Sequence, residues 1–363
     1  MQKIFEGWIE RYFADEEAVI LLLLVVLALV MVATIGHILA PFIAAAIFAF
    51  LLQGSVVRLT RLGVPRLLSV TITFLLFVGL LVSFFVLLLP LVIRQATNFL
   101  NQAPGIISSL QTQFLALPEK YPQIISSGAA DELMRLITRE TSDFAESSLG
   151  YLVSSLPGFM VLLVYLILVP FLVFFMLKDK GELLGGIGSF FPNHRPVLVK
   201  IWNEMNIQLA NYVRGKFIEI LLVGGVSYVT FVLLDVDYAA LLALLAGLSV
   251  IIPYVGVTVV TIPIALVGFF QWGWSSEFMW LMVAYGVIQT LDGNVLVPIL
   301  FSEAVNLHPV VIILAVLFFG GVWGIWGVFF AIPLATLVKV IYNAWPRRTD
   351  KEELPAVSDV PVE

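Results

Sequence analysis

The sequence predicts an all-α polytopic membrane protein with about eight transmembrane helices, Gly/Pro-broken or re-entrant segments in its last half, and a small external helical subdomain. Of its 363 residues, 61% are hydrophobic and only 12% are charged, and the mean hydropathy is +1.05. A soluble domain carries roughly 25% charged and about 45–50% apolar residues. The composition therefore excludes an ordinary soluble enzyme, a disordered chain and a nucleic-acid-binding protein.

Residue types that support enzymatic chemistry are scarce in this chain. It has no cysteine, which excludes disulfides, thiolate metal sites and cysteine nucleophiles. Its three histidines, His37, His194 and His308, are far apart and match no metal-binding spacing. The glycine-rich run at 320–327 lacks the Lys-Ser/Thr end of a phosphate-binding loop, so no ATP site is expected. We expect neither an enzyme nor a cofactor, and a net charge of -6 does not favour a nucleic-acid partner.

Uncharged runs predict where the chain crosses a bilayer, because a transmembrane helix needs about 20 mainly apolar residues at about 1.5 Å each. The first run, 18–57, is long enough for two spans and contains Gly36, His37 and Pro41 at its middle. We therefore expect two helices joined by a tight turn there. The eight expected spans are 18–36, 39–57, 67–93, 152–177, 217–234, 239–270, 278–300 and 309–342.

The distribution of basic residues predicts the orientation, because Lys and Arg in short loops favour the cytoplasmic side. With eight spans, the basic segments at 58–66, 178–216 and 347–351 all fall on one side of the membrane. The segment 94–150, which has more acidic than basic residues, falls on the other side. We therefore expect both termini in the cytoplasm.

Two polar segments interrupt the expected spans. Between 94 and 150, two amphipathic stretches predict a small external helical subdomain. Between 197 and 213, Leu198, Ile201 and Trp202 share one face of a helix that we expect to lie along the cytoplasmic interface. The expected organisation is 1–93 for spans one to three, 94–150 for the external subdomain, 151–180 for span four, 181–216 for the interfacial amphipathic helix, 217–345 for spans five to eight with the transport site, and 346–363 for a disordered cytoplasmic tail.

Two expected spans are too long or too interrupted for one straight helix. Residues 239–270 would extend about 48 Å, and Pro253, Gly256 and Pro263 interrupt them. Paired segments of this kind indicate a transporter's binding site, because non-helical backbone in a membrane must be buried in protein or line a cavity. Alternatively, the prolines only kink packed helices and small residues only allow close packing; whether either segment spans or re-enters stays open. The second segment, 309–342, is interrupted by Gly320, Gly321, Gly324, Gly327 and Pro333.

A polar stretch at 289–294 lies inside the seventh expected span. An ionisable group at the bilayer centre costs at least about 2.5–3.5 kcal/mol, so Asp292 is a candidate ion- or substrate-binding residue. Gln289 and Asn294 accompany it as hydrogen-bonding groups. Alternatively, Asp292 caps a half-helix that begins at Asn294. The residues of the preceding break complete the candidate site: Pro253, Tyr254 and Gly256.

Two further polar pairs have weaker functional implications. Glu303 and His308 flank the next loop and are candidates for a proton relay, since histidine titrates near neutrality. A solvated loop explains them equally well. Glu219 lies one helical turn from Lys216, and we expect these two residues to form an ion pair at the membrane edge.

Several long motifs, in order along the chain, resemble those of the AI-2E family of bacterial transporters, and within it the PerM group of inner-membrane permeases. The resemblance covers about residues 10–346. The motifs are Val-Pro-Phe-Leu-Val-Phe-Phe-Met-Leu-Lys-Asp-Lys at 169–180, Tyr-Val-Arg-Gly-Lys at 212–216, Ile-Pro-Tyr-Val-Gly at 252–256, Leu-Asp-Gly-Asn-Val-Leu-Val-Pro at 291–298, Val-Asn-Leu-His-Pro at 305–309 and Ala-Ile-Pro-Leu-Ala at 331–335.

The resemblance implies an eight-span fold in a bacterial inner membrane, cytoplasmic termini and a homo-oligomer, which is a pentamer in related members. It also implies transport by alternating access. It does not fix the solute, because family members have been associated with export of the autoinducer-2 signal and with exchange of sodium or lithium for protons.

Three functions follow as hypotheses. The first is a secondary transporter that exports a small polar solute, with the broken spans and Asp292 forming its site. The second is a sodium or lithium/proton antiporter with Asp292 as ion ligand, which is weakened because only one carboxylate is evident in the membrane core. The third is a non-transporting membrane scaffold, which leaves the acidic, doubly broken core without a role.

Overall fold

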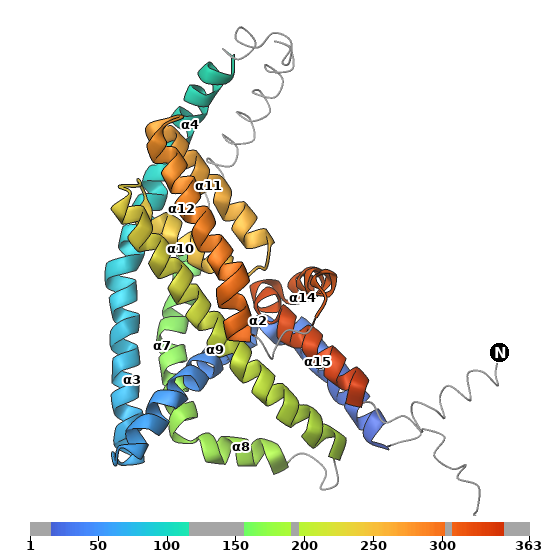
Figure 1. Ribbon diagram of the computed structural model, residues 1–363. Helices are drawn as coiled ribbons and strands as arrows, with labels where there is room; N and C mark the ends of the chain where they lie inside the picture. Colours follow the sequence, from blue (N-terminus) through green and yellow to red (C-terminus); the bar gives the residue numbers. More distant parts are fainter. Residues whose placement is uncertain (1–15, 116–155, 190–195, 302–306, 345–363) are drawn as a thin grey trace, which may run out of the picture. The chain divides into compact units, whose positions relative to one another are not determined.

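A computed structural model of the protein describes residues 16–115, 156–189, 196–301 and 307–344. All regular secondary structure in these ranges is helical (Figure 1). The predicted all-α class is therefore confirmed. The helices are α2 (Glu16–Arg61), α3 (Arg66–Ser83), η1 (Phe84–Leu88), α4 (Leu89–Leu115), α7 (Leu156–Lys178), α8 (Lys180–Ser189), α9 (Pro196–Leu233), α10 (Ala239–Ser249), α11 (Val255–Trp272), α12 (Ser276–Leu291), η2 (Asp292–Leu296), α13 (Val297–Phe301), α14 (Pro309–Phe329) and α15 (Ala331–Ala344).

Within the described residues, six helices are long and apolar enough to cross a membrane. A seventh candidate is a pair bent by 85°, Leu162–Lys178 with Lys180–Gly186. These seven overlap the expected spans two to eight, but within expected spans six and eight the candidates comprise only α11 and α14. The first expected span contains only a shorter apolar helix, Val19–Met31. The protein is a multi-pass membrane protein.

The expected tight turn in the first apolar run is absent, because α2 continues through Gly36, His37 and Pro41. Proline removes one backbone donor, and membrane helices tolerate this loss. Gly36 has a packing role instead of a turning role. A β-carbon there would collide with the indole of Trp323, so the absence of a side chain lets the indole lie against α2.

Two other expected boundaries also lie inside continuous helices. The amphipathic stretch 197–213 and the span that follows it form the single helix α9, which includes the candidate span Leu198–Leu233. The helix that leaves the third span continues past residue 93 as α4 to Leu115. The rest of the expected external subdomain, residues 116–150, and the expected tail, 346–363, lie outside the described residues.

The chain divides into two compact units, which are described separately. The first unit comprises residues 1–40, 184–212 and 303–363, and the second comprises 41–183 and 213–302. In the first unit, the apolar side chains of Leu198, Ile201 and Met205 on α9 pack against Leu21 of α2 and Val340 of α15. Part of the apolar face that the sequence predicts for this stretch is thus buried in protein, whereas Trp202 on the same predicted face is 61% exposed.

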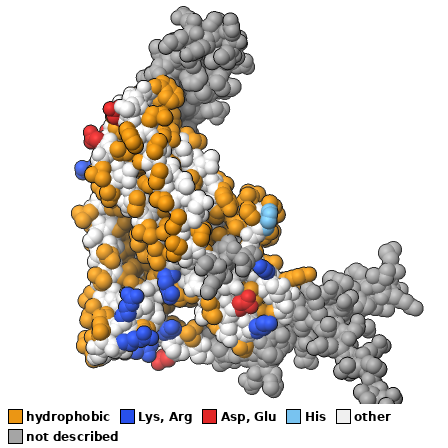
Figure 2. All heavy atoms as spheres, viewed as in Figure 1, with side chains coloured by type: hydrophobic (Ala, Val, Ile, Leu, Met, Phe, Trp, Pro, Cys, Tyr) orange, Lys and Arg blue, Asp and Glu red, His pale blue; other side chains and the backbone are white. Residues whose placement is uncertain are grey.

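The second unit has a basic end and an acidic end (Figure 2). At the basic end, the Arg66 guanidinium donates to the Lys178 carbonyl at 3.3 Å, which joins the start of α3 to the end of α7. At the acidic end, the Leu241 amide donates to Gln95 Oε1 at 2.8 Å, which joins α10 to α4. The charged groups near the basic end include Arg58, Arg61, Arg66, Lys178, Asp179, Lys180 and Glu182, and those near the acidic end include Arg94, Asp235, Asp237 and Glu277.

Helices α10 and α11 form a hairpin within the second unit, called hairpin 1. Gln271 near the end of α11 accepts from the Asp237 amide at 2.9 Å and donates to the Asp235 carbonyl at 2.7 Å. The end of α11 therefore returns to the turn that precedes α10. Segment 239–270 folds back on itself, so both of its ends lie at the acidic end. Its tip, residues 250–254, lies at the opposite end of the hairpin.

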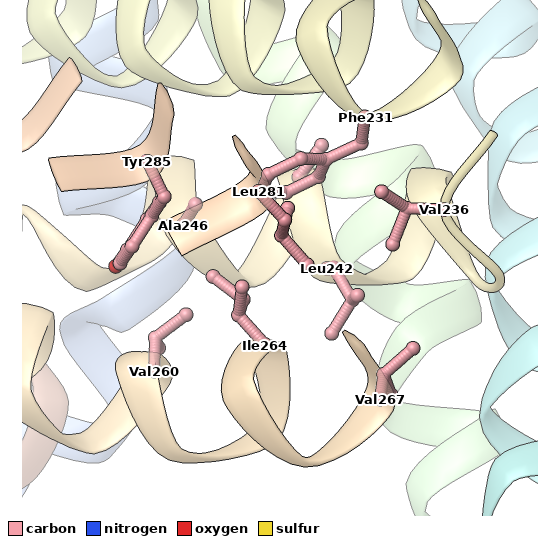
Figure 3. Packing of buried hydrophobic residues seen from close by; sticks show 10 residues of the cluster. Phe231, Val236, Leu242, Ala246, Val260, Ile264, Val267, Leu281 and Tyr285 are labelled. Carbon is pink, nitrogen blue, oxygen red and sulfur yellow. The ribbon is translucent and has the colours of Figure 1, made fainter. Parts of the chain in front are cut away.

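A buried apolar core fixes hairpin 1 to its neighbours (Figure 3). Leu242 of α10 and Ile264 of α11 face each other and are 1% and 0% exposed. Phe231 of α9 and Tyr285 of α12 border this pair, with ring centroids 6.4 Å apart. At about 25 cal/mol per Å² of apolar surface buried, such a core stabilises the arrangement of all four helices.

Helices α14 and α15 form a second hairpin, called hairpin 2, in the first unit. Ala315 of α14 packs with Ala331 and Ala335 of α15, so α15 runs back along α14. The helical path of α14 breaks at Gly324, where φ is 60° and ψ is -139°. This conformation strongly favours glycine. Both interrupted segments of the sequence are therefore fold-back structures.

Candidate functional site

A buried ion pair lies in the middle of α9. Lys216 Nζ is 2.8 Å from Glu219 Oε2, and the two side chains are only 5% and 3% exposed. The same ammonium donates to the Val250 carbonyl at 2.6 Å. It also lies 5.4 Å from the centre of the Phe301 ring. The predicted pairing of Lys216 with Glu219 is confirmed, but the pair is enclosed by protein and contacts the tip of hairpin 1.

Asp292 adds a second buried carboxylate to this region. It begins η2, a π-helical turn between α12 and α13, and is 7% exposed. Single π-helical turns inside longer helices are frequent at functional sites. Asp292 interacts electrostatically with both Lys216 and Glu219. These three residues are called the ion cluster.

The depth of the two helices places the ion cluster well inside the second unit. Lys216 precedes the end of α9 by 17 residues, and Asp292 follows the start of α12 by 16 residues. At about 1.5 Å per residue, both lie about 24–26 Å from the acidic end. Apolar side chains surround this level, since Val223, Val250 and Ile288 pack into one buried group.

The charges of the ion cluster do not balance when all three residues are ionised. One ammonium faces two carboxylates, which leaves one negative charge in surroundings of low polarity. Isolated buried charges are strongly disfavoured unless a counter-charge or proton compensates them. A proton or a monovalent cation bound at the carboxylates would restore neutrality.

Asp292 and Gln289 both carry buried polar atoms that lack a hydrogen-bond partner within the described residues. These atoms are Asp292 Oδ1 and both polar atoms of the Gln289 side chain. Most buried polar atoms in native proteins have a partner, and an exception often marks a place where an ion, water or ligand binds. The sequence predicted Asp292 and Gln289 as site residues, and the structure places Asp292 near Lys216, which contacts the tip of hairpin 1, with Gln289 three residues before Asp292 on the preceding helix.

The tip itself combines a chain reversal with a close helix contact. The chain leaves α10 after Ser249, passes through Pro253 and Tyr254, and enters α11 at Val255. Tyr254 has a positive φ of 63° and is 57% exposed. Gly256 is buried, and a β-carbon there would overlap the Ser249 carbonyl. Glycine at 256 thus allows the start of α11 to approach the end of α10.

The alternative role for Asp292, as the cap of a half-helix, finds no support. No helix begins at Asn294, because η2 continues from α12 into α13. The predicted partner Asn294 is exposed, and its side-chain amide donates to the Thr290 carbonyl of its own helix at 2.9 Å. Asn294 therefore does not join the ion cluster.

The other predicted residues have separate locations. His308 caps α14, where its Nδ1 accepts from the Val310 amide at 3.3 Å. Glu303 lies outside the described residues, so the proton relay stays a prediction. The expected breaks at Pro263 and Pro333 do not occur, because α11 and α15 continue through them. Gly320 and Gly321 lie within α14, and Gly327 packs against the Phe319 backbone at the tip of hairpin 2.

Comparison with known proteins identifies the family. The family model described as "AI-2E family transporter" matches residues 19–347. The chain belongs to the AI-2E transporter family. A similar relative is "Putative permease PerM" of Escherichia coli K12, at 41% identity over 95% of this chain and 98% of the relative. "Putative transport protein YueF" of Bacillus subtilis is 28% identical over 88% and 90% of the two chains, and "AI-2 transport protein TqsA" of Escherichia coli K12 is 26% identical over 89% and 90%.

Membership in the AI-2E family confirms that the protein is of a transporter class and not an enzyme class. No group of three or more metal-ligating side chains occurs among the residues that the structure describes. The ionisable side chains that the structure brings together here are Lys216, Glu219 and Asp292.

The sequence predicted Lys216 and Glu219 at the membrane edge, whereas the structure buries both side chains inside the protein. A signal for their burial was available, since the uncharged run 220–234 holds only 15 residues. About 20 residues are needed to cross the bilayer core. The span therefore has to begin before residue 216, which carries both charged side chains inside it.

Proposed function

We propose that this AI-2E family protein is a secondary transporter that moves a small polar solute by alternating access, with Glu219 and Asp292 binding the coupling proton or cation. The observation that carries the proposal is the ion cluster, which is buried beside the tip of hairpin 1. Ionisable residues inside membrane proteins are costly and mark ion or substrate pathways. A fold-back segment beside such residues is a common form of transporter binding site.

The net charge of the cluster supports coupling to a cation. With Lys216 paired to Glu219 at 2.8 Å, Asp292 lacks a direct counter-charge in the described residues. A site that is neutral only when a proton or cation is bound moves more readily through an apolar environment than a charged one. Movement of the empty, charged site is then disfavoured, which links solute transport to ion movement.

Exchange of sodium or lithium for protons is the second candidate function. The sequence argument against it was the single carboxylate, whereas the structure brings Glu219 and Asp292 into one cluster. Two carboxylates provide oxygen ligands for a small hard cation, which favours such ligands. This candidate needs no organic solute.

We also propose that the basic end of the second unit faces the cytoplasm of a bacterial inner membrane, with both termini on that side. The Arg and Lys side chains at this end support that orientation. A reporter fused after Glu363 or after Arg66 is expected to report the cytoplasm, and one near Tyr121 the exterior. A homo-oligomer, pentameric as the family likeness suggests, is expected in mild detergent; a strictly monomeric mass would contradict it.

The substitution Asp292→Asn tests the proposed function. It keeps side-chain volume but removes the charge and the titratable proton, so we expect normal folding with loss of pH-gradient-dependent transport. Transport is measured in proteoliposomes, with sodium, lithium and the autoinducer-2 signal, which the name of TqsA suggests, and by comparing metabolites of cells and medium on overexpression.

Asp237→Asn is the matched control, because Asp237 is an exposed carboxylate in the turn before α10, away from the ion cluster. It should leave transport unchanged. Cation flux that follows the pH gradient without organic solute would favour the exchanger. Full, normally pH-coupled transport by Asp292→Asn would exclude the charge-based mechanism, and absence of any flux in the unmodified protein would favour a scaffold.

A further inference from the structure

Lys216 connects two elements that are otherwise separate in the sequence. Its ammonium contacts Glu219 on its own helix at 2.8 Å and the Val250 carbonyl at the tip of hairpin 1 at 2.6 Å. An ammonium has three donor hydrogens and no acceptor, so it can hold both oxygens at once. The side chain thus forms a direct link between α9 and the tip.

The Val250 carbonyl is a strong acceptor for a cation. Val250 follows the last residue of α10, and its φ of -65° and ψ of -14° continue the helical direction. The last carbonyls of a helix lack intrahelical donors and carry the negative end of the helix dipole. The ammonium therefore satisfies the end of α10 at the point where the chain reverses.

The stability of this link depends on the surrounding charges. The charged and polar groups that face the ammonium are Glu219 on α9, Asp292 on η2 and the Val250 carbonyl before α11, and the apolar Phe301 ring on α13 makes a cation–π contact with it. A buried ammonium is stable only with counter-charges. When a proton or cation neutralises one of the two carboxylates, the attraction that keeps the ammonium in place weakens.

We propose that Lys216 is a positioning residue that couples occupancy of Glu219 and Asp292 to the position of the hairpin 1 tip. This inference builds on the proposed function, because it uses the same carboxylates as ion-binding groups. With the carboxylates ionised and free, the ammonium holds the Val250 carbonyl and the tip stays against α9. A proton or cation at the carboxylates weakens their hold on the ammonium, the hydrogen bond to Val250 breaks, and the tip separates from α9.

The absence of cysteine from the chain makes a direct distance measurement practicable. Spin labels at Val255→Cys on α11 and Val226→Cys on α9 report the separation of the tip from α9, since both side chains are exposed, at 51% and 49%. Distances are measured by double electron–electron resonance on the full chain in lipid nanodiscs at pH 8 and pH 5. This readout requires neither a known solute nor transport activity.

We expect a narrow distribution at pH 8 and an additional longer-distance population at pH 5 in the labelled protein. Lys216→Gln and Glu219→Gln should show the longer population already at pH 8, whereas Lys216→Arg should retain the narrow distribution and the pH response. Arg214→Gln is the matched control, because Arg214 lies two residues away, is exposed and contacts the Phe50 ring instead of the cluster. It should behave as the unmodified protein.

Two results would overturn the link. One is a distribution in folded Lys216→Gln that matches the unmodified protein at both pH values. The other is a distribution in the unmodified protein that does not change between pH 8 and pH 5, which decides the matter even if Lys216→Gln fails to fold. Because the distances do not depend on solute movement, a failed transport assay with a pH-dependent tip would contradict the proposed function and leave the link intact.

Discussion

Both hairpins fold back on themselves, but the side chains at their tips differ. In each hairpin, a carbonyl near the tip accepts a 2.6 Å hydrogen bond from a side chain of α9. In hairpin 1 the donor is the Lys216 ammonium, and the acceptor is Val250. In hairpin 2 the donor is the neutral Tyr212 hydroxyl, and the acceptor is Phe329.

The surroundings of the two donors differ in the same way. Lys216 lies beside Glu219 and Asp292, whereas Tyr212 lies against the Phe329 ring with centroids 5.9 Å apart. A charged link responds to protons and ions, but a link between a phenol and a carbonyl does not titrate near neutral pH. The charged link is therefore the one that we expect to respond to ions, while the hydrogen bond from Tyr212 to Phe329 carries no charge.

The largest effect is expected from Glu219→Ala, which removes the direct counter-charge of the buried Lys216 ammonium. Breaking a buried ion pair by removing one partner typically costs about 3–5 kcal/mol. We expect a loss of this size in the free energy of unfolding, measured by denaturation in mixed micelles at pH 8.

Glu204→Ala removes an exposed carboxylate from the same helix and should change the free energy of unfolding by less than about 0.5 kcal/mol. The double variant Lys216→Met with Glu219→Leu should recover much of the loss, since apolar replacements of a buried pair are often neutral or stabilising. If Glu219→Ala and Glu204→Ala were equally stable, the buried Lys216–Glu219 ion pair would not contribute to the stability of the fold.

Much of the fold follows from the sequence, because helices in membranes are governed by length and apolarity. The uncharged runs located the helices of expected spans two to five and seven, but the expected spans six and eight fold back as hairpins. Asp292 and Gln289 were found from their polarity inside such a run. The proline positions predicted helix breaks less well. Pro333 lies in the first turn of α15, where a missing amide costs little, and Pro263 lies inside α11, where the helix continues past the lost donor.

The sequence alone did not predict whether the broken segments of the second half cross the membrane or fold back. Whether 239–270 crosses or folds back depends on contacts such as those of Gln271 with Asp235 and Asp237, which join residues 34 or more positions apart. Nothing in the local pattern specifies them. The full ion cluster was missed for a related reason, because it requires α9, the tip of hairpin 1 and η2 to meet at one level.

A smaller effect is expected from Gly256→Ala, which tests whether close packing shapes the tip of hairpin 1. The added β-carbon would overlap the Ser249 carbonyl, and backbone cannot move aside as a flexible side chain does. Overpacking of this kind costs about 1–3 kcal/mol. We expect such a loss in the free energy of unfolding, together with a displaced tip in the spin-label distances.

Gly225→Ala is the control for this substitution, since a β-carbon at Gly225 on α9 meets no atom within 4 Å. Alanine is favoured over glycine in a helix by up to about 1 kcal/mol, so stability should be unchanged or higher. If both alanine variants were equally stable, the close approach at Ser249 would not constrain the tip.

The smallest effect is expected from Tyr212→Phe at hairpin 2, and its pH dependence distinguishes the two hairpins most directly. Phenylalanine keeps the ring that packs on Phe329 but removes the hydroxyl that donates to the Phe329 carbonyl. Loss of one such hydrogen bond costs about 1 kcal/mol. Tyr228→Phe, at an exposed tyrosine of the same helix, is the control and should cost less.

Because a phenol titrates near pH 10, the loss for Tyr212→Phe should be the same at pH 6 and pH 8. The loss for Lys216→Met should differ between these pH values, because the charge of the neighbouring carboxylates determines what the ammonium contributes. A pH-dependent loss for Tyr212→Phe would show that hairpin 2 also responds to pH and would remove the distinction between the two tips.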